Sequence, residues 1–224
     1  ILKTLEAVET TWKALGYQPV LLEAFVPFEK ELAVMVARDH TGEVAVYPVV
    51  ETQQIEQVCR RVIAPARVAQ TVVDEVNAIA RKLVNSLGVV GIFGIELFLT
   101  QGGKVLINEI APRTHNSGHY TLDACVTSQF EQQLRAVSNR PLGSVELTGK
   151  GAVMINLLGT EEAKSDYADK RAALAQIPNS YVYWYGKKQS RIGRKLGHVT
   201  ILTDTSTDGA DLDNLIAAVE RLWY

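Results

Sequence analysis

Short apolar runs separated by turn residues predict a β-meander in the first part of the chain. Residues 20–26, 32–38 and 43–50 are rich in β-branched, aliphatic and aromatic side chains, a composition typical of strands. Residues 39–42 (DHTG) separate the last two runs and favour a tight turn. The pattern therefore predicts three antiparallel strands that follow one another along the chain.

Two helices are predicted on either side of this meander from apolar residues three and four positions apart. Thr4 is the expected N-cap of a short surface helix that ends at Gly16. A longer helix begins at Thr71, which forms a capping-box variant with Asp74, and ends at Gly88. The stripe expected to face the sheet consists of Val72, Val76, Ile79, Leu83 and Leu87.

A hairpin and a further helix follow. Residues 89–99 and 105–110 are strand-like, and Gly102-Gly103 is a suitable two-residue loop between them. Ser128 and Glu131 predict a capping box, for a helix whose inward side chains would be Phe130, Leu134 and Val137.

The last part of the chain predicts a second, smaller α+β unit. A break at residues 139–141 (NRP) favours a boundary, with one domain at 1–145 and another at 146–224. The expected elements of the second are strands at 152–158, 180–185 and 198–203, a helix at about 160–176 and a helix after Asp208. The chain as a whole is predicted to have an α+β fold.

Composition narrows the class of protein. The 224 residues are 47% hydrophobic and 21% charged, as in ordinary globular proteins, and the net charge of −2 argues against binding to nucleic acid or an anionic membrane. No apolar run approaches the roughly 20 residues of a membrane span. Cys59 and Cys125 have neither disulfide-framework nor zinc-site spacing, which favours a reducing cytoplasm. The start at Ile1, without an initiator Met, predicts a fragment or a mature product.

Two glutamates face one another in the predicted hairpin. With residues 102–103 as the loop, Leu97 pairs with Asn108 and Glu96 pairs with Glu109. Like charges opposed on one face destabilise a sheet, and a shared divalent cation removes the repulsion. Magnesium takes one or two carboxylates together with substrate phosphates. Alternatively, both carboxylates are solvated at a sheet edge, or neutralised by an arginine and a lysine.

A dense polar run follows the second glutamate, at residues 108–119 (NEIAPRTHNSGH). Arg113 has a planar fork suited to a carboxylate or phosphate, His115 can hold or move a proton near neutral pH, and Asn116 can orient a polar ligand. Each residue alone is more typical of turn chemistry or a paired surface group. Their occurrence together, next to the paired glutamates, predicts a reactive site on a loop.

With these residues in view, nearly the whole chain resembles the later part of ATP-grasp ligases, specifically the 5-(carboxyamino)imidazole ribonucleotide synthases of purine biosynthesis. The matching stretches are EAFVPF at 23–28 with Glu31, YPVVE at 47–51, GIE at 94–96, NEIAPRTHNSGH at 108–119, WYGK at 184–187 and GRKLGH at 193–198. The resemblance implies an ATP-grasp antiparallel sheet with flanking helices, followed by a small C-terminal α+β domain.

The resemblance also implies an activity and its ligands. Members of this family join bicarbonate to 5-aminoimidazole ribonucleotide, using ATP and Mg²⁺ and forming carboxyphosphate on the way. Members are typically cytoplasmic homodimers, and neither a nucleic acid nor a membrane takes part. The chain begins after the position where complete members carry an N-terminal domain and a glycine-rich phosphate loop, so the 224 residues alone are expected to be inactive.

Residue roles follow from the same resemblance. Glu23, Ala24 and Val26 would line the adenine slot, and Glu31 would accept hydrogen bonds from the ribose hydroxyls. Glu96 and Glu109 would hold Mg²⁺.

Arg113 would orient bicarbonate and stabilise carboxyphosphate, and His115 would assist proton removal. Asn116 would contact the nucleotide substrate. In the basic run at 187–195, Lys187, Arg194 and Lys195 would bind its 5′-phosphate, although such a run is more often a solvated surface.

Two other functions remain open from the sequence. One is another ATP-grasp carboxylate ligase, such as a formate-using enzyme. The other is a non-catalytic fragment that binds nucleotides or anions. The segment at 52–62 departs from the pattern of many family members, so its role is left open.

Overall fold

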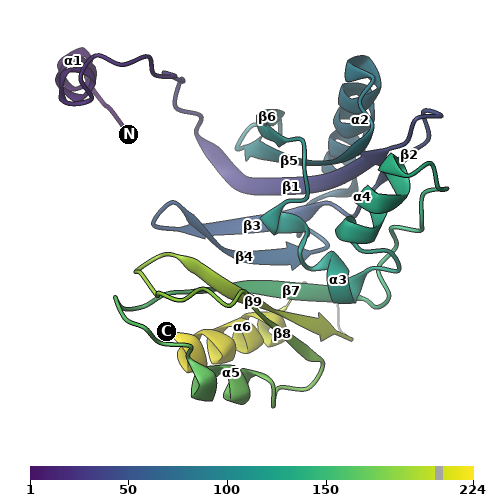
Figure 1. Ribbon diagram of the computed structural model, residues 1–224. Coiled ribbons are helices and arrows are strands. Elements are labelled where there is room, and N and C mark those ends of the chain that lie inside the picture. Colours follow the sequence, from purple (N-terminus) through teal and green to yellow (C-terminus); the bar gives the residue numbers. More distant parts are fainter. Residues whose placement is uncertain (205–208) are drawn as a thin grey trace.

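The computed structural model describes residues 1–204 and 209–224, and all nine strands among these residues belong to one continuous antiparallel sheet (Figure 1). The strand order is β6-β5-β1-β3-β4-β7-β9-β8, and β2 pairs with β1 beside this path. The strands are β1 (Phe28–Arg38), β2 (Val44–Val46), β3 (Val50–Ile55), β4 (Val58–Ala64), β5 (Gly91–Thr100), β6 (Val105–Ala111), β7 (Gly151–Leu158), β8 (Ser180–Trp184) and β9 (Lys195–Thr203).

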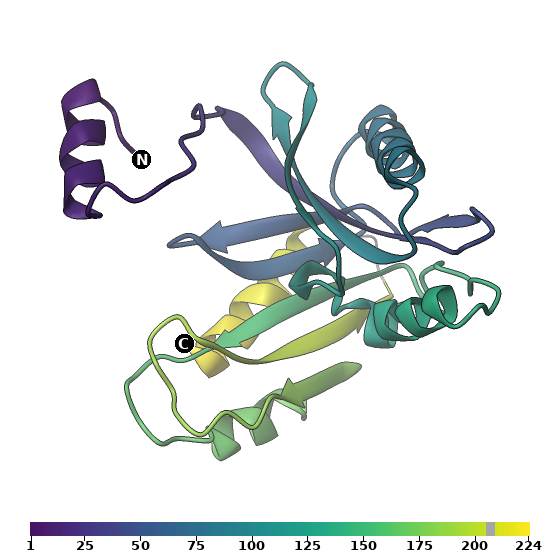
Figure 2. The same cartoon turned by 45° about the horizontal axis from the view of Figure 1, so that its top comes forward.

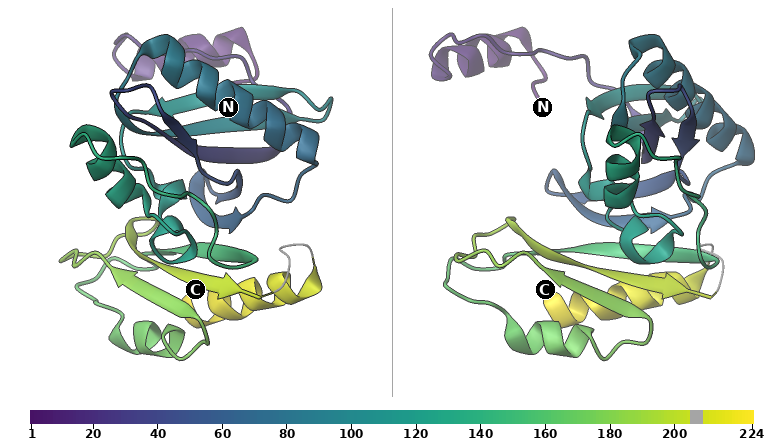
Figure 3. Two further views of the ribbon diagram at one scale, coloured as in Figure 1. Left: turned by 90° about the vertical axis from the view of Figure 1, so that its right-hand side faces the viewer. Right: turned by 45° about the vertical axis from the view of Figure 1, so that its right-hand side comes forward.

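Most of the described helices pack on the sheet, whereas the first one lies apart from it (Figures 1 and 2). They are α1 (Leu5–Ala14), α2 (Gln70–Leu87), α3 (Thr121–Ala124), α4 (Gln129–Val137), α5 (Ala168–Leu174) and α6 (Ala210–Trp223), with a 3-10 turn η1 (Asn116–Gly118). Figure 3 shows α2 lying across one end of the sheet and α6 lying under β7 and β9 at the other. None of the described helices is long and apolar enough to cross a membrane.

Three apolar clusters pack against the sheet, two on one face and one on the other. One lies between α2 and alternate residues of β1 and β5, and another lies between α5, α6 and the strands β7 and β9. Cross-strand partners share a face of a sheet, and the register Leu32–Glu51–Ile63 therefore places both clusters on the same face. The third cluster lies on the opposite face, beneath α3 and its neighbouring loops. We call this second face the site face, because the polar run at 108–119 folds over it.

Both helices predicted for the first half are present, but their details differ. The Thr4 hydroxyl caps α1 by accepting from the Ala7 amide (3.1 Å), and α1 buries none of its residues. The capping box at Thr71 is wrong, because the N-cap of α2 is Ala69, two residues earlier, and Ala69 has no capping side chain. Val76, Ala80 and Val84 form the buried centre of α2, and Leu87 at its end is exposed.

The strand predicted at 20–26 is wrong. These residues run irregularly from α1 to β1, and Leu21 and Leu22 are 83% and 67% exposed. An apolar run needs a neighbouring strand to become part of a sheet, and none of the described strands lies beside it. Conversely, residues 52–62 form most of the β3–β4 hairpin, whose polar composition hid its strands.

The helix predicted near 128 is also oriented differently from expectation. The Ser128 hydroxyl accepts from the Glu131 amide (3.2 Å) as predicted. However, α4 buries Gln129, Gln132 and Ala136, while the predicted inward set, Phe130, Leu134 and Val137, is exposed. Buried amides can outcompete apolar side chains where backbone groups need partners.

In the last part, β7, β8 and α6 match the prediction closely. The helix expected at about 160–176 is reduced to α5, and β9 begins three residues before the predicted strand. Asp208, expected just before the last helix, lies outside the described residues. The boundary between 1–145 and 146–224 stays a prediction, and the sheet runs across it through the pairing of β4 with β7.

Glu51 lies between the two apolar clusters that share the face of the sheet opposite the site face. Its buried carboxylate accepts from Lys30 (2.8 Å) and from Arg67 (3.2 Å), and Arg67 also contacts Asp213 of α6 (3.3 Å). Burial opposes the charge, but the hydrogen bonds from Lys30, Arg67 and Gln53 outweigh it and lower the pKa of Glu51.

We expect Glu51→Gln to lower the free energy of unfolding by about 1–3 kcal/mol. Removing one partner of a buried ion pair costs more, but Lys30 and Arg67 remain 24% and 22% exposed. Because folding lowers this pKa, the stabilisation is complete above the unfolded value of 4.5 and is lost as pH falls through the folded value. Urea unfolding at several pH values tests this, with Glu131→Gln on the surface of α4 as control. Equal effects of the two variants would contradict it.

Candidate active site

The β5–β6 hairpin opposes Glu96 and Glu109, as predicted, but by a different register. Near the turn, Leu97 pairs with Ile107 rather than with Asn108, because the loop is one residue longer than expected. Asn108 is then an extra residue on β6, and this bulge restores the predicted pair Glu96–Glu109.

The carboxylates of this hairpin repel one another. Burial and the charge of Glu109 raise the pKa of Glu96, and Lys195 offsets part of the shift. Glu31, on the neighbouring strand β1, has its pKa raised by burial and by Glu96, although it accepts a hydrogen bond from Gln54 (3.3 Å). The site face therefore carries an incompletely balanced negative charge at this point.

His115 lies against the same carboxylates. Its Nε2 is 3.6 Å from Glu96 Oε1, and its Nδ1 contacts the Ser117 hydroxyl (2.8 Å) and accepts from the Ser117 amide (3.4 Å). An accepting Nδ1 leaves the proton on Nε2, where it faces Glu96. Burial, Arg113 and Lys195 lower the pKa of His115, so the ring is neutral at pH 7.

Close approach of two backbone segments places His115 here. A Cβ atom at Gly94 of β5 would lie 2.6 Å from the His115 Cβ, so only glycine leaves room for the loop. From the other side, Gln129 accepts from the His115 amide and donates to its carbonyl, both at 2.8 Å. The fully buried Gln129 thus holds the backbone of the loop. Sequence reasoning missed this residue because a helical glutamine carries no distinctive signal.

Asn116 and the basic run come together from distant parts of the chain. Lys195 Nζ donates to Asn116 Oδ1 (3.0 Å). Lys187 is close to both Arg194 and Lys195, whose charges, after burial, lower its pKa. The Lys187 ammonium donates to the Lys195 carbonyl and Arg194 to the Gln189 carbonyl (2.9 Å). Three of the predicted cations therefore form one positive cluster beside the predicted reactive loop.

A cavity of about 180 Å³ lies between these groups. Its lining includes Glu96, His115, Asn116 and Lys195, together with residues of the β3–β4 hairpin such as Gln54 and Cys59. The hairpin left open from the sequence thus forms one wall of the cavity. Burial is the main reason that the pKa of the Cys59 thiol rises to about 11. The thiol is therefore protonated and is not a nucleophile.

Arg113 is exposed at the rim, where one of its N–H groups donates to the Thr114 carbonyl (3.0 Å). Its other donors have no hydrogen-bonding partner among the described residues and are available to an anion. Glu109 is exposed as well, so this side of the site is open.

The residues predicted to hold adenine line a separate, mostly apolar pocket of about 440 Å³. Glu23, Ala24 and Val26 form one side, and the stacked rings of Phe28 and Phe98 (4.7 Å between centroids) form part of the other. A flat slot with aromatic and aliphatic walls suits a heterocyclic base. Glu31 does not line this pocket, and its carboxylate lies toward Glu96 instead.

Two further histidines, which received no role from the sequence, stack beneath the loop. His119 and His198 have ring centroids 4.9 Å apart, and Phe130 and Tyr183 cover their outer faces. Burial lowers their pKa values to about 4 and about 3. Both rings are therefore neutral near pH 7 and act as packing between α4 and β9.

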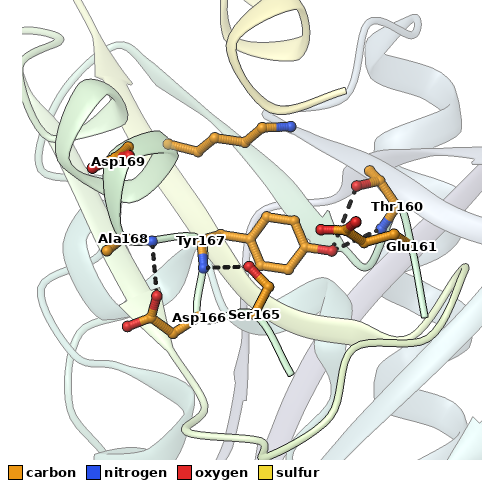
Figure 4. A pocket seen from close by; sticks show the side chains of 8 residues that line it. Thr160, Glu161, Ser165, Asp166, Tyr167, Ala168 and Asp169 are labelled. Atoms are coloured by element: carbon orange, nitrogen blue, oxygen red, sulfur yellow. Dashed lines mark hydrogen bonds between the residues drawn. The ribbon is translucent and has the colours of Figure 1, made fainter. Parts of the chain in front are cut away.

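A larger depression of about 540 Å³ lies elsewhere, around Tyr167 (Figure 4). It contains none of the predicted site residues. The Tyr167 hydroxyl is 2.8 Å from Ser190 Oγ and accepts from the Thr160 amide (3.3 Å), and the Ser165 hydroxyl accepts from the Tyr167 amide (3.3 Å). These contacts hold the loop before α5 in place of the predicted longer helix.

The donor set at the hairpin fits magnesium. Carboxylate oxygens are its preferred protein ligands, and the repulsion that raises the pKa of Glu96 is what a cation would relieve. Among the described residues, no group of three or more acidic, cysteine or histidine side chains is arranged to hold a metal. Two carboxylates alone would therefore need substrate phosphates to complete the coordination.

Comparison with known proteins identifies the fold. Residues 1–130 match the model of the ATP-grasp domain. The chain belongs to the ATP-grasp family. Residues 152–211, beyond the ATP-grasp match, match the phosphoribosylaminoimidazole carboxylase C-terminal domain. The predicted ATP-grasp sheet with flanking helices and a C-terminal α+β part is thereby confirmed.

The chain is also similar over nearly its whole length to several named synthases. The N5-carboxyaminoimidazole ribonucleotide synthase of Synechococcus elongatus is 52% identical over all of this chain, which covers 57% of that protein. The synthetase structure from Thermus thermophilus is 37% identical with a TM-score of 0.84, over 98% of this chain and 58% of that one.

An Aspergillus clavatus synthase, solved with ADP and 5-aminoimidazole ribonucleotide, is 33% identical with a TM-score of 0.84, over 95% of this chain and 58% of that one. This ATP-grasp chain thus spans a little over half the length of these relatives.

Proposed function

We propose that this chain forms the ATP-grasp active site of a ligase that carboxylates 5-aminoimidazole ribonucleotide with bicarbonate. The observation that carries this proposal is the cavity lined by Glu96, His115 and Lys195, together with the pairing of Glu109 opposite Glu96 in the hairpin. The names of the similar proteins, and the ligands in the Aspergillus clavatus structure, support this substrate class.

ATP would bind across the hairpin. The pocket lined by Glu23, Ala24, Val26 and the Phe28–Phe98 stack would take the adenine. Glu31 lies between this pocket and the carboxylate pair on the site face, where it can accept from a ribose hydroxyl if one reaches it. Glu96 and Glu109 would hold Mg²⁺, which neutralises phosphate charge when bound.

The chemistry needs two displacement steps. A bicarbonate oxygen attacks the γ-phosphorus of ATP, and the bond to ADP breaks, giving carboxyphosphate. The amine of the nucleotide then attacks the carboxyl carbon, phosphate leaves, and the nitrogen loses a proton. Arg113, exposed at the rim with free donors, would orient bicarbonate and stabilise the anionic intermediate. His115, which contacts Glu96, would assist removal of the amine proton.

The positive cluster of Lys187, Arg194 and Lys195 would bind the 5′-phosphate of the nucleotide. A monophosphate needs only two or three such donors, and Asn116, bonded to Lys195, would contact the same substrate.

We expect Arg194→Ala to raise the KM for 5-aminoimidazole ribonucleotide about tenfold or more, while the KM for ATP stays nearly unchanged. Arg194 donates to the Gln189 carbonyl and keeps its remaining donors for a ligand. The test is a steady-state kinetic measurement on the full-length protein, in which each substrate is varied in turn. Arg191→Ala, in the same basic run but exposed, is the matched control. An effect on ATP alone would contradict the phosphate assignment.

ADP release separates the proposed reaction from its alternatives. Release that depends on bicarbonate and on the aminoimidazole nucleotide supports it, whereas dependence on formate identifies another carboxylate ligase. The third possibility is a non-catalytic protein that binds nucleotides. It would be supported if calorimetry shows that the 224 residues bind MgATP while the full-length protein shows no turnover. Such chemistry and the free Cys59 and Cys125 favour a cytoplasmic location. The homodimer stays a prediction.

A further inference from the structure

Asn156 is a polar side chain buried in an apolar strand. It lies on β7, where every residue is buried, and it is itself 0% exposed. Its register partner on β9 is His198, which places both side chains on the site face. An amide at such a position is costly unless its hydrogen bonds are made.

Asn156 makes these bonds mainly with Asn116. Asn116 Nδ2 donates to Asn156 Oδ1 (2.8 Å), and Asn156 Nδ2 donates back to Asn116 Oδ1 (2.9 Å). The two amides therefore form a closed pair that joins the strand β7 to the reactive loop. Asn116 lies in the range matched by the ATP-grasp domain, and Asn156 lies in the range matched by the C-terminal domain.

A closed amide pair could exist in two orientations, related by turning both amides over. The groups at its two ends allow only one of them. The Cys59 carbonyl, which can only accept, is 2.9 Å from Asn156 Nδ2, and the Lys195 ammonium, which can only donate, is 3.0 Å from Asn116 Oδ1. The orientation follows from this network.

This orientation determines what Asn116 can offer to a ligand. Its oxygen already accepts from Asn156 and from Lys195, and one of its two N–H groups donates to Asn156. One N–H remains without a partner among the described residues, and Asn116 lines the cavity of about 180 Å³. In this state Asn116 is a hydrogen-bond donor only.

We propose that Asn156 is a positioning residue that holds the Asn116 amide as a donor toward an acceptor oxygen of the nucleotide substrate. This inference rests on the proposed function for the identity of the substrate. It also explains why the buried strand β7 carries an asparagine. Asn156, in the C-terminal part, determines whether Asn116, in the ATP-grasp part, donates or accepts a hydrogen bond. A role limited to fastening the two parts together would not require a particular amide orientation.

Asn156→Asp is the sharpest variant, because it keeps the shape and removes the donor. The Cys59 carbonyl loses its bond from Asn156, and Asn116 Oδ1 keeps only Lys195 as a donor and faces a carboxylate oxygen instead of an N–H group, so the Asn116 amide turns or shifts. We expect the KM for 5-aminoimidazole ribonucleotide to rise at least about tenfold in the gene-encoded protein, with the KM for ATP nearly unchanged. Asn139→Asp, the same change at an exposed turn after α4, should leave both constants unchanged.

A double-mutant cycle with Asn116→Ala distinguishes positioning from general stabilisation. If Asn156 acts through Asn116, Asn156→Asp should raise this KM no further once Asn116 is alanine. Multiplicative effects of the two changes would overturn the proposal. If Asn156→Asp does not fold, Asn116→Asp removes the proposed donor while Asn156 and Lys195 keep an acceptor. An unchanged KM for the nucleotide in that variant would equally overturn it.

One readout needs no turnover. In ¹⁵N-labelled protein, the side-chain amide signal of Asn116 should shift in Asn156→Asp and stay in place in Asn139→Asp. Absence of that shift overturns the inferred orientation whatever the kinetics show. If the wild-type protein does not carboxylate the aminoimidazole nucleotide, the proposed function is refuted. The amide signal of Asn116 still tests the inferred orientation in that case.

Discussion

Glu109→Gln should slow ADP release at least about a hundredfold, which is the range expected when a main electrostatic stabiliser of transferred charge is removed. Glu109 stands opposite Glu96 in the hairpin, and its charge contributes to the raised pKa of that residue. Glutamine keeps the length and removes the charge, so Glu96 loses its repulsive neighbour and Mg²⁺ loses an anionic ligand. The fold should be retained, because Glu109 is exposed.

The measurement is ADP release by the gene-encoded protein as a function of Mg²⁺ concentration. In the variant, half-saturation by Mg²⁺ should move to higher concentration, and chelation of the metal should stop the wild type. Glu75→Gln, an exposed change on α2, is the matched control and should behave as wild type. Wild-type turnover with an unchanged Mg²⁺ dependence in Glu109→Gln would rule out the metal role.

Arg113→Lys should lower kcat by about 10²–10³-fold with little change in the KM for ATP. The positive charge is kept, so an effect of this size would come from the loss of the planar fork that bonds a carboxylate or phosphate through two N–H groups. In the structure, Arg113 uses only one described hydrogen bond, to the Thr114 carbonyl, and its exposure means that the fold does not depend on it.

Bicarbonate-dependent ADP release with the nucleotide substrate at saturation tests this second variant. Arg140→Lys, at an exposed position after α4, controls for the chemical change alone. An unchanged kcat together with an unchanged KM for bicarbonate would remove Arg113 from the proposed chemistry.

Sequence patterns are sufficient where residues close together in the chain determine the structure. The predicted stripe of α2 was largely right, because Val76 is buried and Val72, Ile79 and Leu83 pack against the same cluster. The αL residue Gly88 ends the helix as predicted, so α2 was visible from local spacing alone. The pair Glu96–Glu109 was also predicted, yet the assumed pairing of Leu97 with Asn108 was wrong. The extra loop residue and the bulge at Asn108 shift the register in opposite directions, so their effects cancel at Glu96 and Glu109. Neither feature has a local signal strong enough to be predicted.

Other features depended on partners that are remote along the chain. The predicted strand at 20–26 failed because no described strand pairs with it, and α4 turned its amides inward because Gln129 bonds the backbone of His115. The contact between Lys195 and Asn116 joins residues 79 positions apart, and the bond of Asn156 to the Cys59 carbonyl spans 97. Spacing in the sequence carries no information on such contacts.

The sequence by itself determined the types of residue available for chemistry, the main helices and most strands, and, through resemblance, the ATP-grasp fold. These depend on short-range periodicity, on caps and on the chemical nature of each side chain, all of which act within a few residues. Only the tertiary structure decided that β3 and β4 wall the cavity, that three cations of the basic run cluster beside Asn116, and how the amides of Asn116 and Asn156 are oriented. A hydrogen bond depends on distance and direction between atoms, and the folded sheet sets both.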